Sequence, residues 1–272
     1  MIKLDAGLDL NLAGVKIRHQ AALGDGHLFS WMFEGLGGAS FMYPWDVLYP
    51  EWGPQADGSF GYTMDCLGNS EHPLRLQVRL TSASEHQLDL KARMHNLSER
   101  YYTYCWADMC LMFKYAPRYA DRRGERCILH TAKGLVPADQ WARVVRQHAW
   151  SPVVQSYRVQ GVDVPYPYGV VQGLALWSAS PEPVQSGCIM MARADGKWHI
   201  GLGWDVTASV AHNPDDEHHC VHSDPWFGTV PPGEAVTRRG VLLFVEGSAG
   251  DLLQRFLEWR EISSMLASQE RR

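Results

Sequence analysis

Two neighbouring segments of the chain alternate apolar and polar residues over eight or more positions. They are LRLQVRLTS (74–82) and HQLDLKARMH (86–95), and a short polar stretch separates them. A period of two is the pattern of a strand with one face buried and one face in solvent, whereas a helix repeats its apolar positions every three or four residues. The sequence therefore predicts an antiparallel hairpin, and with it a fold built mainly from β-sheet.

Most of the remaining chain also has strand character. The segment 101–113 is apolar and aromatic throughout, which predicts a central strand covered on both faces. Asp195-Gly196 suits the positive φ angles of a hairpin turn and joins two further strands. The other predicted strands are 168–178, 187–194, 197–210 and 235–247.

Two helices are expected. Pro137 opens a short helix over 137–150. A longer helix over 248–268 starts at Ser248, and Leu252, Leu253 and Phe256 form part of an apolar stripe that should lie on the sheets. No repeat or linker divides the chain. We therefore expect one all-β domain over 1–272, with a C-terminal helix packed on it and one short inserted helix.

Composition excludes several classes of partner. The chain has 272 residues and a formal charge of −5, without the basic clusters that nucleic acids or anionic membranes require. No apolar run approaches the ~20 residues of a membrane span, so we expect a soluble cytoplasmic protein. The six cysteines show no CxxC spacing, which favours reduced thiols.

Aromatic residues are unusually frequent in polar, proline-rich sequence. The chain has 11 Trp and 11 Tyr, many of them in segments such as SFMYPWDVLYPEWGP (40–54) and VDVPYPYG (162–169). Flat rings with a polar edge suit a sugar-binding cleft, because the C–H faces of a pyranose stack on them. The alternative is that these rings only close the ends of a β-sandwich. The expected partner is a small sugar or an oligosaccharide.

The most distinctive stretch is HHCVHSDPWFGTVPPGE (218–234). A strand over 217–223 would place His218, Cys220, His222 and Asp224 on one face. His222 is the predicted proton-transfer residue, because imidazole titrates near neutral pH, and Asp224 could orient it. The alternative is that His222 only bonds to a loop backbone. His218 and His219 follow an acidic turn and are expected to be solvated.

A second group of candidates follows the central strand in APRYADRRGERCILHT (116–131). His130 is the second predicted catalytic residue, and Arg126 and Asp121 could bind a uronate or sugar hydroxyls. The alternative is a surface loop with Asp–Arg pairs. The predicted sugar-binding set is completed by Trp204, Asp205, Trp226, Tyr168 and Trp106.

Metal ligation is a further alternative. His218, Cys220 and His222 are similar to the alternate-position ligands of cupin-like centres, and thiolate with imidazole suits zinc. Spacing identifies no distant ligand. We therefore expect no metal and no cofactor, and a cupin-like metal-dependent enzyme remains an alternative function.

The order of sequence features towards the C-terminus resembles the order found in the galactose mutarotase-like superfamily. This superfamily contains aldose 1-epimerases and other carbohydrate-active domains. CVHSDPWFGTVPPGEAVTRRGVLLF (220–244) follows that family's sequence of a catalytic strand, a Pro-Gly-Glu turn and a long final strand, and HNLSE (95–99) is similar to its turn before the central strand. The resemblance implies a large antiparallel supersandwich and places His222 where the family has its catalytic carboxylate.

The chain departs from that family in its catalytic residues. Where the family carries an acid histidine in an NHxYFNL-type motif, this chain reads YCWADMCLMF (104–113), with Asp108 the only ionisable residue nearby. The resemblance therefore implies the fold, but it does not by itself imply the mutarotase reaction. We expect a carbohydrate-active enzyme with His-mediated acid/base chemistry on a sugar, uronate or glycoside, either an epimerase- or mutarotase-like isomerase or a β-eliminating lyase. The rival is a non-catalytic carbohydrate-binding module.

Overall fold

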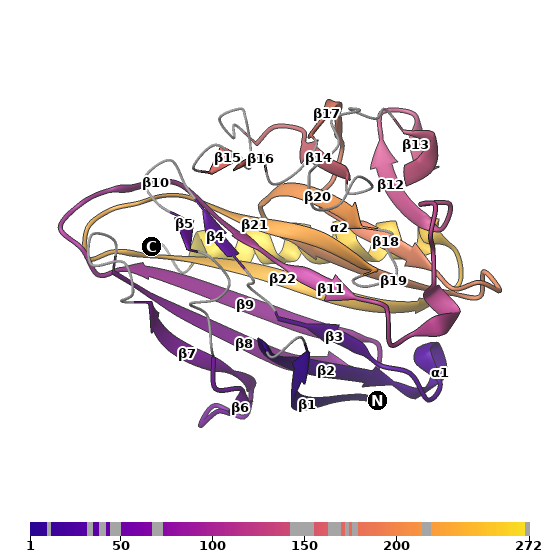
Figure 1. Cartoon of the computed structure of the whole chain (residues 1–272), viewed down its shortest axis with the longest axis horizontal. Coiled ribbons are helices and arrows are strands. Elements are labelled where there is room, and N and C mark those ends of the chain that lie inside the picture. Colours follow the sequence, from indigo (N-terminus) through magenta and orange to yellow (C-terminus); the bar gives the residue numbers. More distant parts are fainter. Residues whose placement is uncertain are drawn as a thin grey trace.

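A computed structural model describes residues 1–9, 12–31, 35–37, 42–43, 50–66, 73–141, 155–162, 170–171, 174–175, 179–213 and 219–269. Most of these residues form two large β-sheets that pack face to face, and the C-terminal helix lies behind the second sheet in Figure 1. The predicted all-β sandwich with a C-terminal helix is confirmed.

The first sheet has 11 strands and runs in the order β1-β2-β3-β11-β21-β10-β4-β5, with β20, β14 and β17 attached beside β21. Strands β10 and β11 follow one another along the same side of β21, and β20 pairs with its other side. Its strands are β1 (Ile2–Asp9), β2 (Leu12–His19), β3 (Leu28–Ser30), β4 (Gly35–Gly37), β5 (Met42–Tyr43), β10 (Tyr102–Asp108), β11 (Cys110–Met112), β14 (Gln155–Val159), β17 (Ala179–Val184), β20 (Thr207–Asn213) and β21 (Cys220–Val230).

The second sheet has nine strands in the order β13-β12-β18-β19-β22-β9-β8-β7-β6. They are β6 (Gly53–Pro54), β7 (Phe60–Cys66), β8 (Leu74–Ser84), β9 (Gln87–Asn96), β12 (Cys127–Thr131), β13 (Gly134–Pro137), β18 (Ile189–Ala192), β19 (Trp198–Trp204) and β22 (Ala235–Glu246). A separate pair is formed by β15 (Val170–Val171) and β16 (Leu174–Ala175). The helical segments are α1 (Gln20–Leu23), the 3₁₀ turns η2 (Pro117–Tyr119) and η3 (Ala138–Gln140), and α2 (Ala249–Gln269).

The hairpin predicted from alternation is β8–β9. Its register runs from Leu74↔Asn96 to Ser84↔Gln87, and buried residues alternate with more exposed ones along both strands. Leu76 and Val78 point into the layer between the sheets, where apolar side chains of both sheets form the main core. Burial of these side chains removes apolar surface from water and is the main force that holds the sandwich together.

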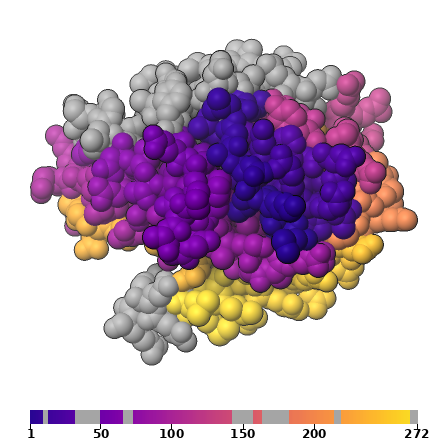
Figure 2. Space-filling view, turned by 90° about the horizontal axis from the view of Figure 1, so that it is seen from below, coloured from indigo at the N-terminus to yellow at the C-terminus, as the bar shows by residue number. Residues whose placement is uncertain are grey.

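The helix α2 packs on the outer face of the second sheet. Leu252 and Phe256 are fully buried there and lie over Gly201 and Gly203 of β19, where a Cβ atom would come within 2.4 Å of each side chain. Ser248 and Asp251 cap the helix reciprocally: Ser248 N donates to Asp251 Oδ2 at 2.8 Å, and Asp251 N donates to Ser248 Oγ at 3.2 Å. Figure 2 shows the C-terminal segment along the lower margin of the molecule, below the N-terminal strands.

Several predicted boundaries were wrong. The single strand expected over 197–210 is two strands, because the chain turns at Asp205–Val206 and β20 joins the other sheet. The strand expected over 217–223 begins at Cys220 and continues through Pro225 to Val230. Proline is tolerated there because the pairing with β20 is irregular at that end of the strand.

Other expectations are met only in part. The central strand over 101–113 is interrupted at Met109, whose N–H donates to Asp224. In the region expected to form a helix over 137–150, Ala138–Gln140 form a 3₁₀ turn and 142–150 lie outside the described residues. The region 168–178 is described only in β15 and β16. The sandwich is also not wholly antiparallel, since β14 and β17 pair in parallel.

Candidate functional site

Strands β10, β11 and β21 bring carboxyl, imidazole and thiol side chains together on one face. Cys110 lies opposite His222, and Trp106 lies opposite Trp226. Val221 and Leu111, which point the other way, belong to the core between the sheets. The side chains on the opposite face of these strands therefore form a row on the outer face of the first sheet. The row consists of Cys220, His222, Asp224 and Trp226 on β21, with Trp106, Asp108 and Cys110 beside them. We call it the outer-face row.

The centre of the row is a contact between Asp108 and His222. Asp108 Oδ1 lies 2.6 Å from His222 Nδ1, and both side chains are buried. On the other side of the ring, His222 Nε2 lies 3.2 Å from Cys220 Sγ. The carboxylate that orients His222 is thus Asp108 rather than Asp224, because Asp108 reaches the ring from the neighbouring strand.

Asp224 occupies the same face but has partners of its own. Its Oδ1 accepts from Met109 N at 3.2 Å, and its Oδ2 accepts from Ser209 Oγ at 2.5 Å. An oxygen of Asp224, an oxygen of Asp108 and a ring nitrogen of His222 lie within 4.8 Å of one another. Asp224 and His222 therefore converge on one place, as alternation along the strand predicts.

Burial and neighbouring charges shift the pKa values of His222 and Asp224. Burial lowers the pKa of His222, but Asp108 and Cys220 outweigh that effect and hold the pKa well above its ordinary value. Burial and the neighbouring Asp108 raise the pKa of Asp224 to about 7, against the opposing effects of His222, Ser209 and the Met109 N–H. Such perturbed, mutually interacting groups are typical of functional sites.

Two sets of side chains in the row have the donor atoms of a metal site. One set is Cys110, Cys220 and His222, and the other is Asp108, His222 and Asp224; within each set the donor atoms lie within 4.8 Å of one another and all three residues are buried. His218, which the sequence suggested as a ligand, lies outside the described residues.

Aromatic rings border the carboxylate end of the row. Trp106 and Trp226 belong to one small apolar cluster with Ala208, and Tyr104 stacks on Trp226 with ring centroids 6.3 Å apart. Trp106 is buried, Trp226 is half-buried and Tyr104 is exposed. Tyr104 also has a φ of 58°, a strained backbone conformation for a bulky residue. Two of the predicted sugar-binding rings thus flank Asp108 and Asp224.

The structure does not place His130 with His222. His130 lies on β12 of the second sheet, on the same side as Ile128, which packs against the apolar cluster under α2. Burial and the charge of Arg260 lower its pKa, and its Nδ1 is buried with no hydrogen-bond partner in the described part of the chain. The two predicted catalytic histidines therefore lie apart, because they belong to different sheets and the core lies between those sheets.

Asp121 acts within its own loop. Its carboxylate accepts backbone N–H groups of residues 123 to 127, including Gly124 at 3.0 Å and Cys127 at 2.9 Å. Its own N–H donates to His219 Nε2 at 3.1 Å, so His219 is buried rather than solvated. Arg126 is half-buried in this loop. These contacts hold the loop closed and turn the Asp121 carboxylate inward, away from a ligand.

The remaining candidates are distributed differently. Trp204 is fully buried in the core between the sheets and donates to Ser223 O at 2.8 Å, so it cannot stack on a sugar. Asp205 lies in the turn before β20, where burial raises its pKa and Arg238 opposes the rise. The adjacent Val206 O accepts from Trp226 N at 2.9 Å, which places this turn beside the aromatic end of the row. Tyr168 lies outside the described residues.

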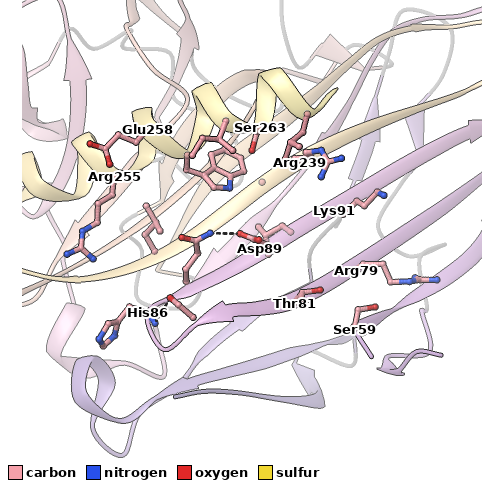
Figure 3. A pocket seen from close by; sticks show the side chains of 18 of the residues that line it. Ser59, Arg79, Thr81, His86, Asp89, Lys91, Arg239, Arg255, Glu258 and Ser263 are labelled. Carbon is pink, nitrogen blue, oxygen red and sulfur yellow. Dashed lines mark hydrogen bonds between the residues drawn. The ribbon is translucent and has the colours of Figure 1, made fainter. Parts of the chain in front are cut away.

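A wide groove lies on the opposite side of the molecule. It has a volume of about 880 Å³ and runs between α2 and the outer faces of β8, β9 and β22, with Arg79, Lys91, Arg239 and Arg255 among its lining residues (Figure 3). None of the predicted site residues that the structure describes lines it.

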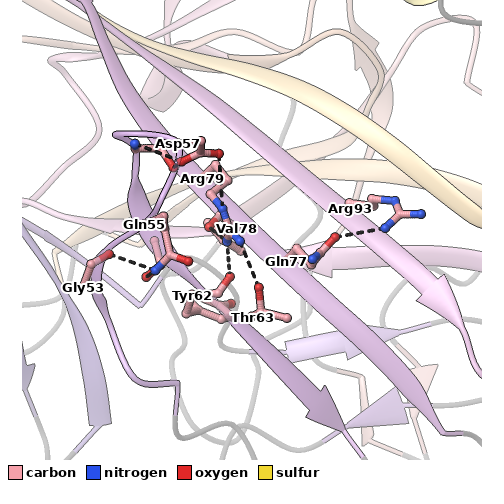
Figure 4. Close-up of polar contacts among 11 residues, drawn as sticks. Gly53, Gln55, Asp57, Tyr62, Thr63, Gln77, Val78, Arg79 and Arg93 are labelled. Atoms are coloured by element: carbon pink, nitrogen blue, oxygen red, sulfur yellow. Dashed lines mark hydrogen bonds and ion pairs between the residues drawn. The ribbon is translucent and has the colours of Figure 1, made fainter.

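Polar side chains in this groove largely bind one another or the backbone. Gln87 donates to Asp89 at 2.7 Å, and Arg79 donates to the carbonyl oxygens of Tyr62 and Val78 and to Thr63 Oγ1 (Figure 4). Arg79 and Asp89 are thus engaged by their neighbours on the sheet surface. The outer-face row remains the candidate functional site.

Sequence reasoning missed Cys110, Ser209 and Tyr104. Cys110 and Ser209 enter the site only through the pairing of β11 and β20 with β21. The sequence did contain a signal for Cys110. Trp106, Asp108 and Cys110 are each two residues apart in the central segment, so a strand there would place all three on one face.

Comparison with known proteins gives matches among solved structures at low sequence identity. No family model matches the sequence, and no curated protein matches it. Among solved structures, galactose 1-epimerase from Lactobacillus acidophilus is 11% identical with a TM-score of 0.44, and covers 91% of this chain and 100% of its own. A protein described as an aldose 1-epimerase from Klebsiella pneumoniae is 8% identical with a TM-score of 0.39, covering 93% of this chain and 60% of its own.

A third similar structure is described as a kojibiose phosphorylase from the human microbiome. It is 8% identical with a TM-score of 0.38, and the match covers 88% of this chain but only 26% of that longer protein. Two of these three structures bear the name of the 1-epimerases that the sequence resembles, and all three TM-scores are below 0.5. Within the described residues, no helix is long and apolar enough to cross a membrane.

Proposed function

We propose that the protein is a carbohydrate-active enzyme whose substrate binds at the aromatic end of the outer-face row. The observation that carries this proposal is the placement of Trp106 and Trp226 two residues along their strands from Asp108 and Asp224, on the same face. Indole rings offer apolar faces to a pyranose, and the adjacent carboxyl groups offer partners for its hydroxyls. Tyr104 and Trp226 form the accessible end of this arrangement.

The chemistry that this arrangement supports is proton transfer next to a sugar carbonyl or a uronate carboxylate. Removal of such a proton and its return to the other face gives an epimerase-like reaction, and loss of a leaving group after removal gives β-elimination. Asp224 and the Asp108–His222 pair supply groups that can hold and deliver the proton.

The rival function is sugar binding without turnover. A binding module needs the rings, but it does not need two carboxyl groups buried beside a histidine. Such groups are expensive to bury, and at an unoccupied structural position apolar residues would serve the fold as well or better. The presence of this buried polar row on the outer face therefore favours an enzyme.

The first experiment is a thermal-stabilisation screen of free sugars, uronates and unsaturated glycosides. A ligand at about 100 times its dissociation constant adds roughly 2.7 kcal/mol to the free energy of unfolding. Trp226→Ala should weaken binding of any hit about tenfold or more. Trp204→Phe is the matched control, because it alters a buried indole in the core and should leave the affinity unchanged.

The second experiment separates an enzyme from a binding module. In Asp224→Asn, turnover of the hit should fall about 10²-fold while the affinity is largely kept. Unchanged sugar binding in Trp226→Ala would refute the proposed site. Absence of turnover in the wild-type protein on every ligand that binds would support the binding module.

A further inference from the structure

Three side chains in the outer-face row form a set of soft metal ligands. The Sγ atoms of Cys110 and Cys220 and a ring nitrogen of His222 lie within 4.8 Å of one another, and all three residues are buried. Both cysteines are thiols rather than members of a disulfide. We propose that Cys110, Cys220 and His222 bind one zinc ion.

The distances suit a tetrahedral ion. With Zn–S near 2.3 Å and Zn–N near 2.0–2.1 Å, a sulfur and a nitrogen ligand are separated by about 3.5 Å and two sulfur ligands by about 3.8 Å. His222 Nε2 and Cys220 Sγ are 3.2 Å apart, so a shift of a few tenths of an ångström brings them to this separation. Cys110 enters from β11, directly opposite His222 in the strand register. Two paired strands thus hold the ligands at fixed spacing.

Asp108 orients the imidazole for this role. Its carboxylate lies 2.6 Å from Nδ1, which fixes the proton on that nitrogen and leaves Nε2 directed to the cysteine side. A carboxylate that accepts the second ring N–H is the usual support for a zinc-bound histidine, and it raises the basicity of the ligand. Asp108 is therefore a positioning residue in this site, not a ligand.

The alternative set of Asp108, His222 and Asp224 is a poorer cation site. Asp108 Oδ1 is already hydrogen-bonded to His222 Nδ1. Both oxygens of Asp224 also accept hydrogen bonds, one from Met109 N and the other from Ser209 Oγ. Binding through these oxygens would break contacts that are buried. Thiolate and imidazole also select zinc over the hard cations that carboxylates prefer.

Three protein ligands leave a fourth position open, as in catalytic zinc sites. The binding of the metal does not depend on the proposed function.

The test uses the purified 272-residue chain after treatment with a chelator. Zinc titration followed by gel filtration and elemental analysis should give one ion per chain. Co²⁺ in place of zinc should give the intense near-ultraviolet absorption of thiolate-to-metal charge transfer. Cys110→Ser and Cys220→Ser should each reduce that absorption by about half and lower the affinity at least tenfold, and the double variant should remove the absorption. Cys188→Ser, at a buried thiol in the apolar cluster under α2, is the matched control and should keep both.

Asp108→Asn should weaken zinc binding about 10- to 100-fold while the charge-transfer absorption at saturation is retained. A readout without substitution is differential alkylation of the wild-type chain: zinc should protect Cys110 and Cys220 from alkylation and leave Cys188 unchanged. Absence of zinc in the wild-type chain, equal protection of all three thiols, or a Cys110–Cys220 disulfide in place of the metal would overturn the inference. A chain that binds zinc but no sugar would refute only the proposed function.

Discussion

The carboxylate of Asp108 lies 2.6 Å from Nδ1 of His222, although 114 residues separate them in the chain. Strand β21 carries the histidine, and the line of β10 and β11 brings the carboxylate alongside it. The pair is buried at the centre of the outer-face row, so each partner depends on the other for a hydrogen bond.

This dependence can be measured by a double-mutant cycle. Asp108→Ala and His222→Ala should each lower the free energy of unfolding by about 3–5 kcal/mol, because each leaves a buried polar or charged partner behind. The double variant should be more stable than the sum of the two effects predicts, by about 1–3 kcal/mol. Urea unfolding in the presence of a chelator is the measurement. Strictly additive effects would contradict the contact.

The loop closed by Asp121 gives a second prediction. Asp121→Ala should lower the free energy of unfolding by about 3 kcal/mol or more, because several backbone N–H groups lose their common acceptor. The dissociation constant of a bound sugar should not change. Glu125→Ala, at an exposed side chain of the same loop, is the control and should stay within about 0.5 kcal/mol. A loss of sugar affinity at normal stability would restore Asp121 as a binding residue.

A third prediction concerns the packing of α2 on β19. Gly203→Ala would place its Cβ 2.4 Å from Phe256 Cε2, so we expect a loss of about 1–3 kcal/mol by chemical unfolding. Phe256→Leu should be less harmful in the Gly203→Ala background than in the wild type, because the smaller side chain relieves the overlap. At Gly53, where a Cβ meets no atom within 4 Å, substitution by Ala should have little effect. If the two glycine variants behave alike, the helix does not rest on β19 as described.

A fourth prediction concerns pH. The imidazole of His19 accepts from Ala22 N through Nδ1 at 3.1 Å, lies 2.9 Å from His86 Nδ1 through Nε2, and stacks on Phe244. Burial, and then the neighbouring His86, lower the pKa of His19 to about 4. The unfolded chain therefore takes up this proton at a higher pH than the folded chain does.

The neutral His19 side chain therefore makes its full contribution to the free energy of unfolding above pH 6.5, the pKa of histidine in the unfolded chain. This contribution declines as the pH falls and is lost below about pH 4, the pKa in the folded chain. The expected loss is about 1–2 kcal/mol after allowance for solvent screening. His19→Asn keeps an acceptor for Ala22 N but cannot take up the proton. The difference in stability between the wild type and this variant should shrink across that window in urea titrations. A difference that stays constant from pH 7 to pH 4 would refute the assignment.

Alternation along the chain was sufficient to predict the β8–β9 hairpin, and it also predicted which residues share a face. Leu76 and Val78 point inward as their spacing requires, and Cys220, His222 and Asp224 share a face of β21 for the same reason. The helix cap at Ser248 and its apolar contacts were equally local, because capping and amphipathic spacing act within a few residues.

Which strands become neighbours was not encoded in any local pattern. His130 has a titratable side chain suited to catalysis, but it lies in the other sheet. Trp204 is a core residue, although its sequence context resembles a binding loop. Both outcomes depend on sheet order, which follows from the packing of many distant side chains at once.

The sequence by itself therefore determined the period-two strands, the capped terminal helix and the face on which His222 and Asp224 lie, because backbone geometry fixes those features over a few residues. Only the tertiary structure decided that Asp108 and Cys110 meet His222, that His130 does not, and that Asp121 holds a loop. These contacts arise from strand pairing over more than a hundred residues, where the free energy of the whole core, rather than any local preference, selects the register.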